Sequence, residues 1–194
     1  MNNSLRISFF FALAVIACNN PKPSKNDSAS IIIADTAKFY NIARFIEDEI
    51  RYVDLRDFTI IEKKFNGIDT VNRIISKDEF LAAASVVLTQ AKWFMENKSL
   101  FNETVFQDLG TESYTINYSS KTAAIKSIDL LLNQQTNLPK RLFIRLSKQV
   151  RDTAVTEQYS WISNKQFMIG RSVRVDDQFN NNSSSTISWK NQDQ

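Results

Sequence analysis

From Glu112 onward, the chain has the pattern of an antiparallel β-sheet. Short runs rich in β-branched, leucine and aromatic residues follow one another, and segments of polar, turn-forming residues separate them. The turn-forming segments recur at regular intervals, which is typical of an antiparallel meander of about five or six strands. This half of the chain therefore restricts the fold to one in which consecutive strands pair antiparallel.

The segment 124–148, AIKSIDLLLNQQTNLPKRLFIRLSK, predicts one hairpin with its loop centred on Asn137. The expected register opposes Leu132 to Leu142, Leu130 to Ile144 and Ile128 to Leu146 on one face, and Leu131 to Phe143 and Asp129 to Arg145 on the other. Charges of opposite sign directly across two strands stabilise the pairing. We therefore expect Asp129 to be a structural partner of Arg145, and a catalytic Asp129 is the alternative.

A second hairpin is expected over 156–175, TEQYSWISNKQFMIGRSVRV, with its turn at Asn164-Lys165. This register places Tyr159, Trp161 and Met168 on one face. It also opposes Gly170 to Tyr159, where a missing side chain accommodates an aromatic ring or permits a bulge. Both faces of this hairpin are partly apolar.

Two helices are expected before the sheet. Apolar residues recur at three- and four-residue spacing from Phe39 to Val53, with Asp35 as the expected N-cap. The segment from Ser76 to Glu79 has the pattern of a capping box and starts a second helix. Between the helices, Asn66-Gly67 predicts a hairpin whose type I′ turn needs positive φ at both residues.

Two further segments complete the expected fold. Residues 92–110 lack a clean period and are interpreted as a partly helical connection. Residues 178–186, QFNNNSSST, are interpreted as a polar loop before a short final strand with Ile187 and Trp189. The predicted fold class is α+β, with two N-terminal helices around a hairpin and then an antiparallel meander that forms one curved sheet.

The N-terminus predicts a secreted, lipidated protein. Residues 1–17 have a polar start with Arg6 and an apolar run, Ile7 to Ala17, which is shorter than the roughly 20 residues of a spanning helix. The string Val15-Ile16-Ala17-Cys18 resembles the bacterial lipobox, which implies acylation of Cys18 by chains such as palmitate. Residues 18–34 are expected to be a flexible tether and residues 35–190 a single domain.

Composition excludes several classes of function. The chain has no histidine, one cysteine, three separated glycines and a net charge of +3. Histidine-based triads, histidine zinc sites, phosphate-binding glycine loops and a nucleic-acid-binding surface are therefore not expected. We expect no metal, no cofactor and no enzymatic activity. Carboxylate-only catalysis is the alternative, and its candidates are Asp54, Asp57, Asp176, Asp177 and the triplet Glu47-Asp48-Glu49.

Apolar residues on both strand faces suggest a ligand site. A two-layer domain needs only one apolar sheet face. The residues that form the candidate ligand face are Leu131, Phe143, Tyr159, Trp161 and Met168. An acyl chain, a lipoprotein or another apolar molecule between sheet and helices would contact them, and a second core layer is the alternative.

Several strings resemble an uncharacterised family of Bacteroidota lipoproteins: the lipobox, the helix from Phe39 to Ile50, the Asn66-Gly67 hairpin, SKDEF, IKSIDLLL and LPKRLFIRLSK. The resemblance implies no activity. In architecture alone, the pattern is similar to the half-barrel of periplasmic lipoprotein carriers. We expect a lipid-anchored envelope protein on the periplasmic face of the outer membrane, with an interaction or structural role. Its expected partners are the membrane, through Cys18, and an envelope protein or apolar ligand.

Overall fold

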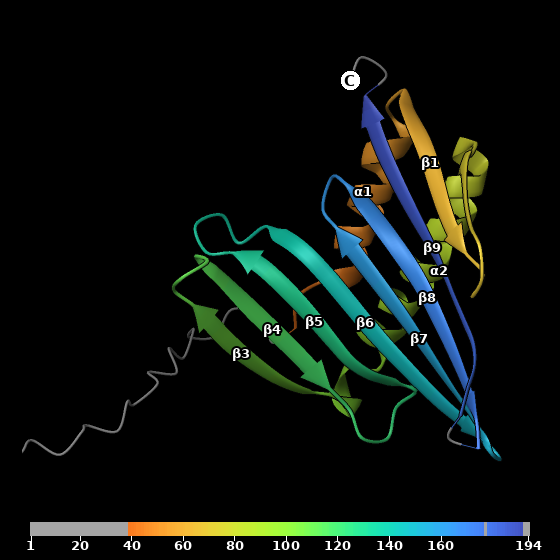
Figure 1. Cartoon of the computed structure of the whole chain (residues 1–194). Helices are drawn as coiled ribbons and strands as arrows, with labels where there is room; N and C mark the ends of the chain where they lie inside the picture. The colour runs from red at the N-terminus through yellow and green to blue at the C-terminus, as the bar shows by residue number, and fades with distance from the viewer. Residues whose placement is uncertain (1–38, 177, 192–194) are drawn as a thin grey trace, which may run out of the picture. The chain divides into compact units, whose positions relative to one another are not determined.

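The computed structural model describes residues 39–176 and 178–191 (Figure 1). The signal sequence, Cys18, the tether and Asp35 lie outside these residues. The elements, in chain order, are α1 (Ile42–Asp54), β1 (Phe58–Phe65), β2 (Thr70–Ile74), α2 (Lys77–Glu96), a 3-10 turn (Lys98–Leu100), β3 (Asn102–Asp108), β4 (Ser113–Ser119), β5 (Ile125–Asn133), β6 (Pro139–Val150), β7 (Thr153–Ile162), β8 (Gln166–Val175) and β9 (Gln178–Asn191).

The strands form one open, curved antiparallel sheet, and the predicted α+β fold class is confirmed. The order of the nine strands is β2-β1-β9-β8-β7-β6-β5-β4-β3. Strands β3 to β9 are a meander, and the β1–β2 hairpin joins the meander through β9. Figure 1 shows both helices behind the sheet in that view, so that one sheet face is covered and the opposite face is left open.

Helix α1 begins later than predicted. Its N-cap is Asn41, whose Oδ1 accepts a hydrogen bond of 3.0 Å from the Arg44 amide. Phe39 lies before the helix with φ +109°, and its ring stacks on Tyr118 with the centroids 5.4 Å apart. The expectation that Phe39 belongs to the helix was therefore wrong. Its positive φ is not helical, and its ring packs against Tyr118 of β4 instead.

Helix α2 begins as predicted and ends later. The capping box is confirmed, because the Glu79 amide donates a hydrogen bond to Ser76 Oγ and the Ser76 amide donates one to the Glu79 carboxylate. The helix then continues to Glu96, and β3 follows the 3-10 turn. The interpretation of 92–110 as a connection missed β3, because most of this edge strand is exposed and has no alternating pattern of burial.

The core lies between the helices and the covered sheet face. Phe80 of α2 packs edge-on against Phe167 and Trp189, at centroid distances of 5.8 and 5.7 Å. Trp161 and Phe167 stack at 4.6 Å, and both are fully buried. These interdigitated rings fill the space that joins α2 to β7, β8 and β9.

The β5–β6 register differs from the prediction by two residues. Ile128 faces Ile144 and Asp129 faces Phe143, and a bulge lies between Leu131 and Leu132. The turn begins earlier than expected because Asn133 Oδ1 accepts hydrogen bonds from the backbone amides of Gln135 and Thr136. A shift of two residues keeps every side chain on its predicted face.

The β7–β8 register differs from the prediction by one residue, and a shift of one residue moves side chains to the opposite face of the sheet. Trp161 faces Phe167, and Gly170 faces Gln158 rather than Tyr159. The loop has three residues, 163–165, with Asn164 at φ +56°, whereas a two-residue turn was predicted. Met168 therefore lies on the face opposite to that of Trp161.

The remaining two turn and loop predictions were partly wrong. The Asn66-Gly67 hairpin is confirmed, but only Gly67 has positive φ, +98°, and four residues separate β1 from β2. The predicted polar loop at 178–186 is part of β9. This strand lies between β1 and β8, and its backbone groups pair on both sides although its sequence is poor in strand-forming residues.

Candidate functional site

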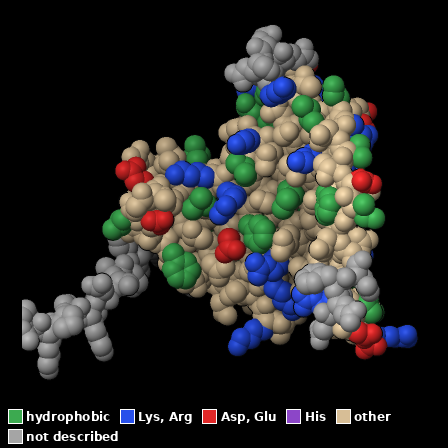
Figure 2. Space-filling model, viewed as in Figure 1, with side chains coloured by type: hydrophobic (Ala, Val, Ile, Leu, Met, Phe, Trp, Pro, Cys, Tyr) green, Lys and Arg blue, Asp and Glu red, His purple; other side chains and the backbone are tan. Residues whose placement is uncertain are grey.

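The open face of the sheet is the candidate functional surface. Cross-strand neighbours on it follow from the register, and one row runs Asn117, Asp129, Phe143, Ser160, Met168, Thr186. Figure 2 shows this face, on which hydrophobic side chains occur singly or in small groups, with Lys and Arg side chains and a few acidic ones between them. The face is therefore neither a continuous apolar surface nor a densely charged one.

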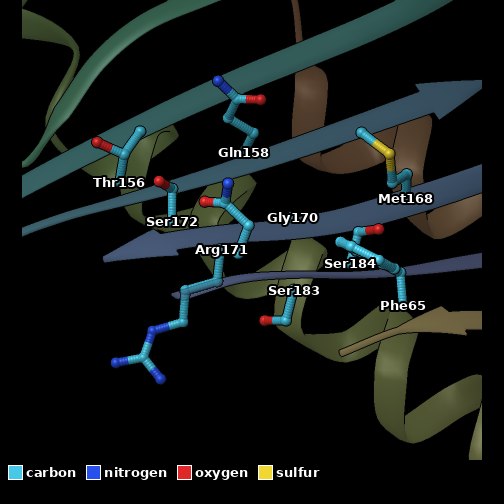
Figure 3. A pocket seen from close by; sticks show the side chains of 10 residues that line it. Phe65, Thr156, Gln158, Met168, Gly170, Arg171, Ser172, Ser183 and Ser184 are labelled. Atoms are coloured by element: carbon cyan, nitrogen blue, oxygen red, sulfur yellow. The ribbon is translucent and has the colours of Figure 1, made fainter. Parts of the chain in front are cut away.

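A hollow of about 300 Å³ lies on this face above Gly170 (Figure 3). Its lining comes from four adjacent strands, β7, β8, β9 and β1. The lining residues are Phe65, Thr156, Gln158, Met168, Gly170, Arg171, Ser172, Asn182, Ser183 and Ser184. The lining is mainly uncharged and polar, with Phe65 and Met168 as its apolar members.

Gly170 lies in the hollow and fills none of it, because it has no side chain. A Cβ built at Gly170 would lie 3.9 Å from the Gln158 carbonyl oxygen and 4.0 Å from its Cβ, which are ordinary contact distances. The open surface could therefore hold a larger residue at this position. Sequence reasoning identified Gly170 but not the hollow, because β9 was expected to be a loop and the register placed Gly170 opposite Tyr159.

The five residues of the predicted ligand face do not lie together. Leu131, Phe143 and Met168 are half-buried on the open face. Tyr159 and Trp161 are buried under the helices, with 3% and 0% of their surface exposed. The prediction of one shared face was wrong for two reasons. The one-residue error in the β7–β8 register grouped Met168 with Trp161, and β6 opposes Phe143 to Ser160, which leaves Tyr159 and Trp161 on the other face.

The predicted ion pair between Asp129 and Arg145 is not formed. Asp129 Oδ1 accepts a hydrogen bond of 2.6 Å from Asn117 Nδ2 on β4. Arg145 faces Ser127 and Gln158, and its guanidinium carbon lies 5.7 Å from the centroid of the Phe143 ring. The physical reason is the two-residue shift, which moves Arg145 along the strand and away from Asp129.

The carboxylates proposed as catalytic alternatives are dispersed. Asp54 ends α1, and Asp57 lies 3.7 Å from Lys77 Nζ with 93% of its side chain exposed. Asp176 is in a turn with φ +48°, and Asp177 lies outside the described residues. Over 39–176 and 178–191, no three or more acidic, histidine or cysteine side chains are grouped so that they could hold a metal ion.

The triplet Glu47-Asp48-Glu49 divides into three environments. Glu47 pairs with Lys92 of α2 at 3.0 Å, and Asp48 pairs with Arg44 at 3.0 Å. Glu49 is 7% exposed and was missed as a buried residue. The signal for its burial was available, because Glu49 falls on the same helical stripe as the buried Ile42, Phe45, Ile46 and Val53.

Glu49 ties α1 to the β7–β8 turn. Its carboxylate accepts hydrogen bonds from Trp161 Nε1 at 3.0 Å, Ser163 Oγ at 2.5 Å and the Asn164 amide at 2.8 Å. These three donors satisfy both oxygens of a group that would be costly to bury unpaired. The arrangement is structural, since the carboxylate faces the core and the turn rather than the hollow.

A second buried carboxylate, Glu62, lies on the covered face of β1. Burial would raise its pKa, but hydrogen bonds from Ser185 at 2.7 Å and Arg73 at 2.7 Å outweigh burial, and the pKa of Glu62 is lowered. Arg73 also bonds Glu79 of α2 at 2.6 Å. This network connects β1, β2, β9 and the start of α2.

The β3 edge is the other notable surface. Within the described part of the chain, β3 pairs with β4 alone, so one row of its backbone groups is unpaired. Val105, Phe106 and Leu109 are 40%, 58% and 76% exposed. Residues 102–108 contain no lysine or proline, which commonly protect an edge strand, and their two charged residues, Glu103 and Asp108, lie towards the two ends of the strand.

Comparison with known protein families, curated proteins and solved structures gave no match. The similarities to Bacteroidota lipoproteins and to periplasmic carriers therefore remain predictions from the sequence. Neither of the described helices is long and apolar enough to cross a membrane.

Proposed function

We propose that this protein is a lipid-anchored lipoprotein of the bacterial cell envelope, with a non-catalytic role in binding another protein. The anchor would be Cys18, on the evidence of the lipobox-like string at residues 15–18 and the apolar run before it. Several acyl chains on one cysteine hold a protein on a bilayer stably. The preferred location is the periplasmic face of the outer membrane.

The observation that carries the binding role is the exposed edge of β3. This seven-residue strand is paired with β4 on one side, so alternate residues present unpaired backbone groups on the other side, and the apolar side chains of Val105 and Phe106 flank those groups. An extended segment of a partner can add to such an edge, with backbone hydrogen bonds for affinity and side-chain contacts for specificity. The partner we propose is therefore a protein segment with alternating apolar residues.

The anchor is tested by metabolic labelling with an alkyne fatty acid. Cys18→Ser should abolish the label and release the protein from membranes, while Ser24→Ala in the tether should leave both unchanged. A label that survives Cys18→Ser would overturn the lipoprotein assignment. Protease treatment of intact and permeabilised cells then reports the membrane face.

The binding role is tested by photocrosslinking in intact envelopes. A photoreactive phenylalanine analogue at position 106 should crosslink to another protein, and the same analogue at position 74 on the opposite edge is the matched control, because Ile74 is also exposed, at 73%. Val105→Lys should abolish the crosslink, and Val71→Lys should not. The purified partner should also slow amide hydrogen exchange across residues 102–108.

Other results of the same experiment would contradict this role. Crosslinks from position 106 only to lipid would place the edge at the membrane. Crosslinks only within the chain, lost after deletion of 31–36, would mean that the chain's own Ile31-Ile32-Ile33 segment covers the edge. Crosslinks only between copies of this protein would make β3 a self-association strand.

A further inference from the structure

Gly170 occupies a position where a glycine needs a reason. It lies within β8, and a glycine inside a strand weakens the strand because it loses more backbone freedom and packs no side chain. Three common reasons are a positive φ, a β-bulge and a close approach of another backbone. None of the three applies to Gly170.

Each reason fails on a specific observation. Among the described glycines, Gly67 alone has positive φ. The β7–β8 register is unbroken across Gly170, and the irregularity between β8 and β9 lies further on, between Val173 and Arg174. An added Cβ would meet Gln158 only at 3.9 Å or more. What the glycine does provide is the floor of the hollow on the open face.

The walls of the hollow carry hydrogen-bonding groups that are free within the described structure. Thr156, Gln158, Ser172, Asn182 and Ser184 each contribute a side-chain hydroxyl or amide to the lining. In residues 39–176 and 178–191, none of these five side chains is hydrogen-bonded to another protein group, although many other polar side chains are. Each can both donate to and accept from a ligand.

The geometry points to a single sugar ring of a neutral glycan as the ligand, and we propose the hollow above Gly170 as a carbohydrate-binding site. A volume of about 300 Å³ is at the small end for ligand sites, which suits one ring with its neighbours outside. The hydroxyl groups at the edges of a sugar can form hydrogen bonds with the hydroxyl and amide side chains that line the hollow. It also has a C–H face for the ring of Phe65 at the apolar side (Figure 3).

The lining disfavours other ligand classes. An acyl chain would leave the hydroxyl and amide groups without partners, which costs free energy. A phosphate or carboxylate ligand needs several cationic or backbone N–H donors, and Arg171 is the single charged member of this lining. The site is separate from the β3 edge, so the carbohydrate proposal does not depend on the protein-binding role.

Saturation-transfer NMR and calorimetry on the full chain in detergent test this inference. The probes are the methyl glycosides of glucose, galactose, mannose and N-acetylglucosamine. At least one should bind with a Kd of about 1 mM, as expected for a small, shallow site. Gly170→Leu fills the hollow and should weaken that binding about tenfold or more.

Controls separate loss of the site from loss of the fold. The melting temperature of Gly170→Leu should be unchanged or higher, because the substitution removes a strand glycine. Thr115→Leu adds similar bulk to the open face on β4, outside the hollow, and should bind as the wild type does. If Gly170→Leu unfolds, Gln158→Ala and Ser184→Ala provide the same test by removing hydrogen-bonding groups.

The inference is overturned by any of three results. The first is that none of the four glycosides binds at concentrations up to about 50 mM, well above the expected Kd. The second is that Gly170→Leu, or both alanine variants, bind as the wild type does. The third is that sodium phosphate or phospholipid vesicles bind at the hollow and the glycosides do not.

Discussion

Replacing Glu49 with alanine should destabilise the domain far more than the same change at its neighbour Glu47. The Glu49 carboxylate accepts three hydrogen bonds, and one donor, Trp161 Nε1, is fully buried. Without the carboxylate, this N–H loses its partner out of reach of water, which costs about 1–3 kcal/mol. Ser163 and Asn164 lie nearer to solvent, and their lost hydrogen bonds add about 0.5–1 kcal/mol each.

The expected loss of unfolding free energy is therefore about 3 kcal/mol, and the melting temperature should fall by roughly 9 °C in a domain of this size. Glu47→Ala removes only the exposed pair with Lys92, in which the two side chains are 53% and 37% exposed. That pair contributes about 0.5 kcal/mol or less. Glu49→Gln keeps one acceptor oxygen and should give an intermediate loss.

Urea unfolding of the mature chain carrying Cys18→Ser is a suitable assay. Of the three tryptophans, Trp161 and Trp189 are buried and Trp93 of α2 is half-buried, so tryptophan fluorescence reports mainly on the core that includes the Glu49 contact. The m-values of the variants should match that of the wild type, because the surface exposed on unfolding is nearly the same. If Glu49→Ala and Glu47→Ala lower the stability equally, Glu49 does not tie α1 to the β7–β8 turn.

Two further predictions concern polar contacts. Because the pKa of Glu62 is lowered in the folded state, its contribution is complete above its ordinary value of 4.5 and is lost as the pH falls below that value toward the folded pKa. The stability difference between wild type and Glu62→Gln should therefore shrink over this acidic range in urea titrations, and a constant difference would contradict the network. In double-mutant cycles, Asn117 and Asp129 should couple by about 0.5 kcal/mol or more, while Asp129 and Arg145 should be additive within about 0.3 kcal/mol. Strong coupling of Asp129 with Arg145 would favour the register predicted from sequence instead.

Local signals in the sequence predicted the structure well, and signals that depend on distant partners did not. The Ser76–Glu79 capping box is complete within four residues, so its prediction was correct. The hairpin registers depended on the lengths of the turns, and both predicted lengths were wrong. Asn133 starts one turn early through its side-chain hydrogen bonds, and Asn164 has positive φ in a three-residue loop. An error of two residues preserved the faces of β5 and β6, whereas an error of one residue misplaced Met168.

The candidate site was the least predictable part for the same reason. Four of the ten residues that line the hollow come from β9 and β1, which lie next to each other only because the two ends of the domain pair. Nothing in the string NNNSSST distinguishes a strand with two neighbours from a loop, since backbone pairing rather than side-chain propensity determines this segment. Asn182 and Ser184 could therefore not be recognised as lining residues in advance.

The pairing of β1 with β9 also affects when the domain can fold during synthesis and export. Residue 58 pairs with residue 191 and residue 65 with residue 184, and Phe80 packs on Trp189 of the same last strand. A ribosome-bound chain that ends before β9 lacks the strand that joins the N-terminal hairpin to the meander, and such distant pairings form slowly. For the exported protein proposed here, this order favours a chain that is still unfolded when it enters the translocation channel. A nonsense codon just before β9 would then remove the fold of the whole domain rather than one strand.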